Sequence, residues 1–125
     1  MRLPNHENAQ VPQDKVTGYL LSATHRDGRH KAAFFVRYGF SAANWEVLAE
    51  ALQRHAADNE VARSEQTPFG RRYAVDGRLL TPNGSAVNVR VVWFVEEGES
   101  VPRLVTAYPL PMRQHPGQSD EVSEG

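Results

Sequence analysis

The chain has 125 residues, of which 40% are hydrophobic and 23% are charged, and its formal net charge is −1. This length predicts one domain with enough apolar residues for a buried core. The near-neutral charge excludes a protein that binds long nucleic acid over its whole surface, so a nucleic-acid role would require a local basic patch or a short substrate. Because the sequence has no cysteine, disulfides, cysteine-ligated zinc and thiol catalysis are excluded.

No segment of the sequence is apolar over the length that a membrane span requires. The first residues also lack the apolar stretch of a signal peptide. We therefore expect a cytoplasmic protein without membrane contact, while a domain cut from a larger secreted chain would show the same features.

Residues 1–11 are expected to form an extended arm, because prolines at positions 4 and 12 disfavour helix in the residues before them. Residues 12–109 are expected to form a single α+β domain, which opens with a short helix from Pro12 to about Leu21. Residues 110–125 combine prolines with an acidic end, which predicts a disordered tail.

Two further helices are predicted before residue 60. The first spans His30–Tyr38, and Gly39 supplies the left-handed residue that ends it. Ser41 caps the second helix. The apolar face of that second helix follows the i, i+3, i+4 spacing and contains Trp45, Leu48, Ala49, Leu52 and Ala56.

From residue 60 onward the hydrophobic period changes to two, which predicts strands. The expected strands are Glu60–Gln66, Arg71–Val75, Arg78–Thr81, Ala86–Glu96 and Arg103–Tyr108, with turns that include Asp76-Gly77 and Asn83-Gly84. One face of the strand 86–96 is wholly apolar and consists of Val87, Val89, Val91, Trp93 and Val95. The order of elements predicts an α+β fold in which N-terminal helices pack on one face of a four- to five-stranded antiparallel sheet.

The segment 24–31 concentrates two histidines, two arginines and a lysine just before a predicted helix, a position that favours anion binding. Lys31 would lie in the first helical turn, where the helix dipole disfavours a cation by up to about 1 kcal/mol. A bound phosphate would reverse that cost, with Arg29 as a further substrate-binding cation. His25 and His30 would supply a proton donor and acceptor. The alternative is a solvated loop whose charges maintain solubility.

Two more groups suit phosphate chemistry. Thr106 and Tyr108 are two residues apart, so they share a strand face with Leu104 and present two hydroxyls. Arg90 interrupts an apolar strand, and its planar fork suits a phosphate. The alternatives are that Thr106 and Tyr108 are ordinary strand formers and that Arg90 faces solvent. No histidine and carboxylate spacing resembles a metal site, and we expect no cofactor.

Several of these motifs together resemble an uncharacterised bacterial domain family over residues 3–109. The motifs are Leu3-Pro4-Asn5, Tyr19-Leu20-Leu21, His25-Arg26-Asp27-Gly28, Lys31-Ala32, Phe34-Phe35, Gly39-Phe40, Pro68-Phe69-Gly70, Asn88-Val89-Arg90 and Arg103-Leu104-Val105-Thr106-Ala107-Tyr108-Pro109. This family resemblance implies no established activity.

More loosely, the chain resembles the toxin nucleases of the barnase, EndoU, colicin E5/D and RelE superfamily. That resemblance implies helices before a small antiparallel sheet, and RNA cleavage without a metal by attack of the neighbouring 2′-hydroxyl. It implies catalytic roles for His25, Lys31, Thr106 and Tyr108. The sequence departs from the common motif at Arg26, where proline often follows the histidine.

The favoured hypothesis is a metal-independent, toxin-type endoribonuclease domain that acts on RNA phosphodiesters. His25 would remove the 2′-hydroxyl proton, Lys31 and Arg90 would stabilise the transition state, and Tyr108 or His30 would protonate the leaving oxygen. Thr106 would orient the phosphate. The alternative is a non-catalytic binding, adaptor or immunity-type module. Expected partners are RNA or a cognate inhibitor protein, and the sequence leaves catalysis and oligomeric state open.

Overall fold

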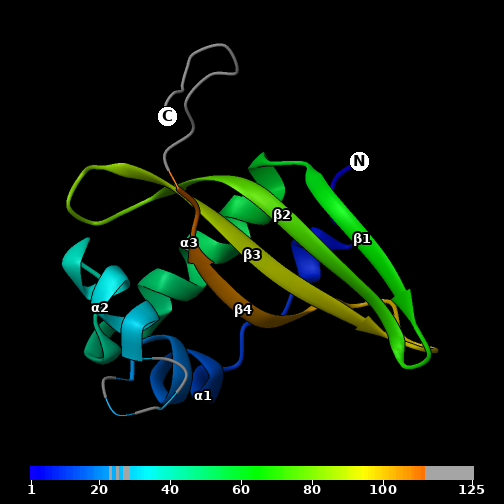
Figure 1. Ribbon diagram of the computed structural model, residues 1–125, viewed down its shortest axis with the longest axis horizontal. Coiled ribbons are helices and arrows are strands. Elements are labelled where there is room, and N and C mark those ends of the chain that lie inside the picture. The colour runs from blue at the N-terminus through cyan, green and yellow to red at the C-terminus, as the bar shows by residue number, and fades with distance from the viewer. Residues whose placement is uncertain (23, 25, 27–28, 112–125) are drawn as a thin grey trace.

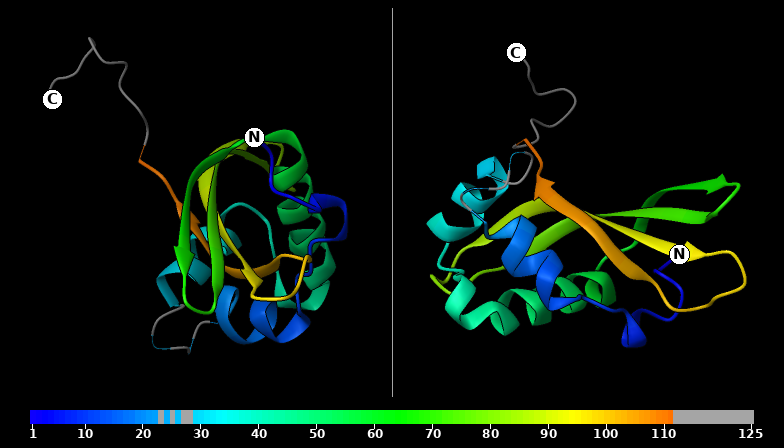
Figure 2. Two further views of the ribbon diagram at one scale, coloured as in Figure 1. Left: turned by 90° about the vertical axis from the view of Figure 1, so that its right-hand side faces the viewer. Right: turned by 90° about the horizontal axis from the view of Figure 1, so that it is seen from below.

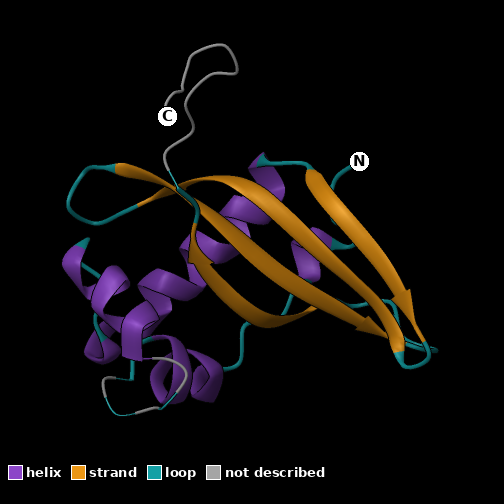
Figure 3. Ribbon diagram, viewed as in Figure 1, coloured by secondary structure: helices purple, strands orange, loops and turns teal. Residues whose placement is uncertain are grey.

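The computed structural model describes residues 1–22, 24, 26 and 29–111. Short helical segments come first, then a longer helix, then four strands (Figures 1 and 3). The elements are η1 (His6–Asn8), α1 (Gln13–Lys15), the π-helical turn η2 (Val16–Leu20), α2 (Arg29–Arg37), η3 (Ala42–Asn44), α3 (Trp45–Asp58), β1 (Val61–Thr67), β2 (Gly70–Leu80), β3 (Ala86–Glu96) and β4 (Arg103–Pro109). In the described part of the chain, no helix combines the length and apolarity that a bilayer crossing needs.

The four strands form one antiparallel sheet in the order β1-β2-β3-β4. Within the part of the chain that the structure describes, the helices lie against one face of this sheet and leave the other face uncovered (Figure 2). The predicted α+β fold, with helices on one face of an antiparallel sheet, is therefore confirmed. We call the uncovered side the open face. Polar side chains of the sheet, such as Arg90 and Tyr108, lie on this side.

One predicted turn is wrong. The strands expected at 71–75 and 78–81 are a single strand, β2, which runs without a break through Asp76 and Gly77. Asp76 pairs with Arg90 of β3, and Gly77 pairs with Val89. A side chain at position 77 would collide with the side-chain amide of Asn59. Gly77 therefore serves a close approach of the helix end to the strand and does not mark a turn.

The core lies between the helices and the covered face of the sheet. The predicted apolar face of β3 is confirmed, because Val89, Val91 and Trp93 are completely buried. The predicted cap is also present, since the Ser41 hydroxyl accepts a hydrogen bond of 3.3 Å from the Asn44 amide just before α3 begins. Residues before position 12 take part in this core, with Leu3 1% exposed. The segment expected as a tail lies mostly outside the described residues, from 112 onward.

His55 is a buried polar residue within this core. Its side chain is 1% exposed, and its Nε2 lies 3.2 Å from the Gly77 carbonyl oxygen and 3.3 Å from that of Val89. Because both partners are acceptors, Nε2 carries a proton and donates to them. Nδ1 is buried with no partner among the described residues. Burial lowers the pKa of His55 below its ordinary value of 6.5, against smaller opposing effects of the two carbonyls, Asp76 and Asp58.

The lowered pKa of His55 predicts a loss of stability in mild acid. With the folded pKa below 6.5, the unfolded chain binds more protons as the pH falls through 6.5, so the unfolding free energy decreases there and is fully retained above it. The slope due to His55 has an upper limit of about 1.4 kcal/mol per pH unit, the value for uptake of one proton. Urea unfolding between about pH 7.5 and about pH 5 measures it, and a His55→Gln variant should show a flatter profile. An equally steep profile in the variant would contradict this assignment.

Candidate functional site

The two hydroxyls of β4 both lie on the open face. Tyr108 pairs with Arg90, and Thr106 pairs with Val92, whereas Leu104 pairs with Trp93. A bulge between the last two pairs adds one residue to β4. The bulge turns Leu104 into the core, 3% exposed, so the expectation that it shares a face with the two hydroxyls is wrong. Thr106 and Tyr108 remain together, each half-buried.

Tyr19, at the end of the first helical segment, connects the hydroxyls to the predicted basic segment. Its hydroxyl lies 3.2 Å from the Thr106 hydroxyl, within hydrogen-bond distance. The ammonium groups of Lys15 and Lys31 each lie 5.5 Å from the centre of the Tyr19 ring, a distance typical of cation–π contacts. Lys31 of α2 and Thr106 of β4, both predicted as site residues, therefore meet at Tyr19.

Sequence reasoning missed Tyr19, because it counted this residue within an apolar run. One signal was available: Lys15 precedes Tyr19 by four residues, so a helix places the two side chains on the same face. The hydroxyl's partner, Thr106, is 87 residues away in the sequence and had no local signal.

Arg90 lies beside Tyr108 but is already engaged. Its Nε donates to Asp76 Oδ1 at 2.7 Å, and its Nη2 donates to Asp76 Oδ2 at 2.8 Å. This bidentate pair, supplemented by a hydrogen bond with the Tyr108 hydroxyl, raises the pKa of Arg90 above its already high ordinary value. The Arg90 side chain therefore lies beside Tyr108, while much of its own fork is taken by a carboxylate.

The other predicted residues lie at or near the start of α2. Arg29 and His30 are the first two residues of this helix, and both are exposed. Lys31 follows them and is half-buried. The first turn contains no acidic residue, and these three side chains lie at the positive end of the helix dipole. His25 lies outside the described residues.

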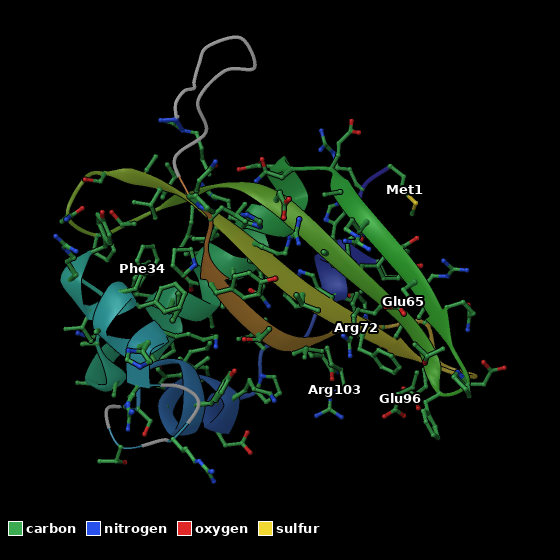
Figure 4. The ribbon with its side chains drawn as sticks, viewed as in Figure 1. Met1, Phe34, Glu65, Arg72, Glu96 and Arg103 are labelled. Carbon is green, nitrogen blue, oxygen red and sulfur yellow. The ribbon has the colours of Figure 1, made fainter. Side chains whose placement is uncertain are left out.

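Two pockets are lined by residues of the candidate site, including Tyr19 in one and Tyr108 in the other. The larger, of about 730 Å³, lies between the first helical segment and the sheet and is lined by Lys15, Tyr19, Arg72, Phe94 and Arg103 among others. The smaller, of about 250 Å³, lies on the open face and is lined by Arg63, Arg72, Arg90 and Tyr108 among others. Arg72 borders both pockets. Figure 4 shows Arg72 and Arg103 near each other at one end of the sheet, beside the carboxylates of Glu65 and Glu96.

The charged groups of the open face differ in how they are used. Within the described part of the chain, Arg90 has a carboxylate partner, while Arg63, Arg72 and Arg103 have no ion pair. Among the same residues, no group of histidine and carboxylate side chains is placed to hold a metal ion. The arrangement of ammonium, guanidinium and hydroxyl groups is chemically suited to the oxygen atoms of a phosphate.

These features define an α+β domain whose open face carries arginines, carboxylates and two hydroxyls. Residues 2–111 match the family model described as Domain of unknown function (DUF6883), so the chain belongs to this family. This membership confirms the expected uncharacterised domain family. No curated protein sequence matches the chain.

One similar solved structure is a chain of a "Contact-dependent growth inhibition toxin - immunity protein complex from Klebsiella pneumoniae 342". The two chains superpose with a TM-score of 0.66 at 18% sequence identity, over 83% of this chain and 95% of that one. At this level of identity the comparison establishes a shared fold.

Proposed function

We propose that this chain is a toxin-type endoribonuclease domain that cleaves RNA phosphodiesters without a metal ion. The observation that carries the proposal is the contact of Tyr19 with both Thr106 and Lys31, which joins two predicted site elements that are distant in sequence. The similarity in fold to a chain from a toxin–immunity protein complex supports the same class. This similarity also supports a cognate protein partner. Because the proposed substrate is RNA, we propose that the activity takes place in the cytoplasm.

In the proposed reaction, the ribose 2′-oxygen attacks the adjacent phosphorus and gives its proton to a base. The products are a 2′,3′-cyclic phosphate and a 5′-hydroxyl, because the leaving 5′-oxygen takes a proton from an acid. We assign the base to His25 from the sequence alone, and the acid to Tyr108 or His30. Lys31 stabilises the negative charge that develops on the phosphate oxygens, and Thr106 orients them.

The proposed role of Arg90 differs from a direct phosphate clamp. Because its Nε and Nη2 donate to Asp76, its proposed contribution is to add positive charge to the open face beside Tyr108. Arg72 and Arg103 border the adjoining pockets without ion pairs among the described residues. These two side chains are therefore better placed to contact phosphates on either side of the cleaved bond.

The decisive experiment is incubation of the purified chain with total tRNA in the presence of EDTA. We expect fragments that end in a 2′,3′-cyclic phosphate, and loss of cleavage in a His25→Ala variant. A His6→Ala variant, altered in η1 outside the proposed site, should cleave like the wild type. If the wild-type protein cleaves no RNA and is not toxic to cells, the enzyme proposal is overturned.

A second candidate is a non-catalytic, immunity-type binding module. The observations that favour it are the net charge of −1 and the carboxylate that occupies the Arg90 fork. The same incubation distinguishes the two candidates, since an immunity-type module would leave tRNA intact.

A further inference from the structure

β1 forms an open edge of the sheet. It lies at the end of the strand order and, among the described strands, pairs with β2 alone. Five of its seven residues are exposed, from position 62 to position 66. The β1–β2 hairpin extends away from the helices (Figures 1 and 2). The opposite edge differs, because the Gln10 backbone bonds to Pro102 and Leu104 beside β4.

The hydrogen-bond pattern shows which part of the edge is available. The turn between β1 and β2 has two residues, so Thr67 and Gly70 form a hydrogen-bonded pair, and Glu65 with Arg72 forms the next one. By this alternation, Ser64 and Gln66 direct their backbone N–H and C=O groups outward. The start of the edge is occupied, since the Val61 amide donates to the Met1 carbonyl oxygen at 2.7 Å.

This stretch carries only some of the usual devices that prevent edge pairing. Residues 62–66 contain neither proline nor lysine, and the one bulge of β1 lies at their start, between Val61 and Arg63. Their two charges, Arg63 and Glu65, have opposite signs and project from the open face. A charged edge of this kind repels or attracts a second strand according to the register.

Only one register of self-pairing satisfies these charges. Antiparallel pairing centred on Ser64 places Arg63 of one copy opposite Glu65 of the other, and the two-fold symmetry produces this contact twice. A shift of the centre by one residue sets Glu65 against Glu65 or Arg63 against Arg63. In-register parallel pairing also sets like charges together. In the favoured register, Glu65 lies between Arg72 of its own chain and Arg63 of the second copy.

We propose that β1 is the contact surface for a second copy of this chain, by antiparallel pairing about Ser64 that joins the two four-stranded sheets into one. The contact is short and mainly backbone, so the dimer is weak and depends on protein concentration. This dimer is independent of the proposed ribonuclease activity.

A charge swap tests the register directly. Sedimentation of the wild-type chain from about 10 μM to about 1 mM should show a monomer–dimer equilibrium. Arg63→Glu and Glu65→Arg should each weaken dimerisation about tenfold or more, because each creates two like-charge contacts. An equimolar mixture of the two variants should restore association, since each then faces the opposite charge. Arg54→Glu, the same charge change at an exposed position of α3, should dimerise like the wild type.

Amide hydrogen exchange supplies a measurement that needs no substitution. Exchange at Ser64 and Gln66 should slow as the wild-type concentration rises, while exchange at other exposed amides stays constant. A wild-type chain that remains monomeric throughout the range overturns the proposal. So does a mixture of folded variants that fails to associate better than either variant alone.

Discussion

Replacing Lys31 with alanine is expected to lower the rate of RNA cleavage about 100- to 1,000-fold, the usual cost of removing one preorganised group that stabilises transition-state charge. Lys31 is one of two described cations, with Lys15, that approach Tyr19, whose hydroxyl lies within hydrogen-bond distance of Thr106. Lys31 is half-buried and lies in the first turn of α2, at the positive end of the helix dipole. Loss of this charge should therefore lower kcat more than it raises KM.

A control from the same helix separates this effect from a loss of general positive charge. Arg37 is exposed in the last turn of α2, so Arg37→Ala removes one cation at the opposite end of the helix. Cleavage by this variant should stay within about twofold of the wild type. Single-turnover cleavage of a labelled RNA measures both variants. Equal rates for Lys31→Ala and the wild type would remove Lys31 from the proposed mechanism without excluding ribonuclease activity.

Replacing Gly70 with alanine is expected to destabilise the fold by about 3 kcal/mol or more. Gly70 begins β2 with a φ of 149°, a backbone conformation that side-chain-bearing residues rarely adopt. An added Cβ would also meet the Val95 carbonyl oxygen and the Glu96 backbone of β3. Because the added Cβ would collide with backbone atoms of β3, the pairing of β2 with β3 would itself have to shift.

Gly98, in the turn between β3 and β4, provides the matched control. Its φ of 84° is also positive, but a Cβ there would meet open space. Gly98→Ala should therefore cost only the conformational penalty of about 1–2 kcal/mol. Urea unfolding of both variants compares the two costs. Similar costs would show that the collision at Gly70 is relieved by small movements.

The parts of the fold that could be predicted are those determined by local periodicity. The face of α3 around Leu52 and the face of β3 around Val91 follow directly from spacings of 3.6 and two. The errors arose where a tertiary contact changes a local rule. Gly77 has the sequence signature of a turn, but its missing side chain makes room for Asn59. The bulge in β4 shifts Leu104 to the other face, and the amino-acid order alone gives no sign of it.

The candidate site was predictable in its residue types and less so in its connections. Thr106 and Tyr108 share the open face as the strand period predicted, and Lys31 lies in the first turn of its helix. The engagement of Arg90 by Asp76 depends on strand register, which spacing does not determine. Tyr19 joins the site only through a contact between the first helical segment and the last strand.

The hydrogen bond between Tyr19 and Thr106 joins residues 87 positions apart in the sequence. The site can therefore assemble only after both segments have folded. During synthesis on the ribosome, a chain that has not yet released β4 holds Lys31 and Tyr19 without either strand hydroxyl. Contacts of such high sequence separation form late, after the local helices and the β2–β3 hairpin. A growing chain therefore carries no assembled site, and whatever chemistry the open face performs begins only when the final strand has docked.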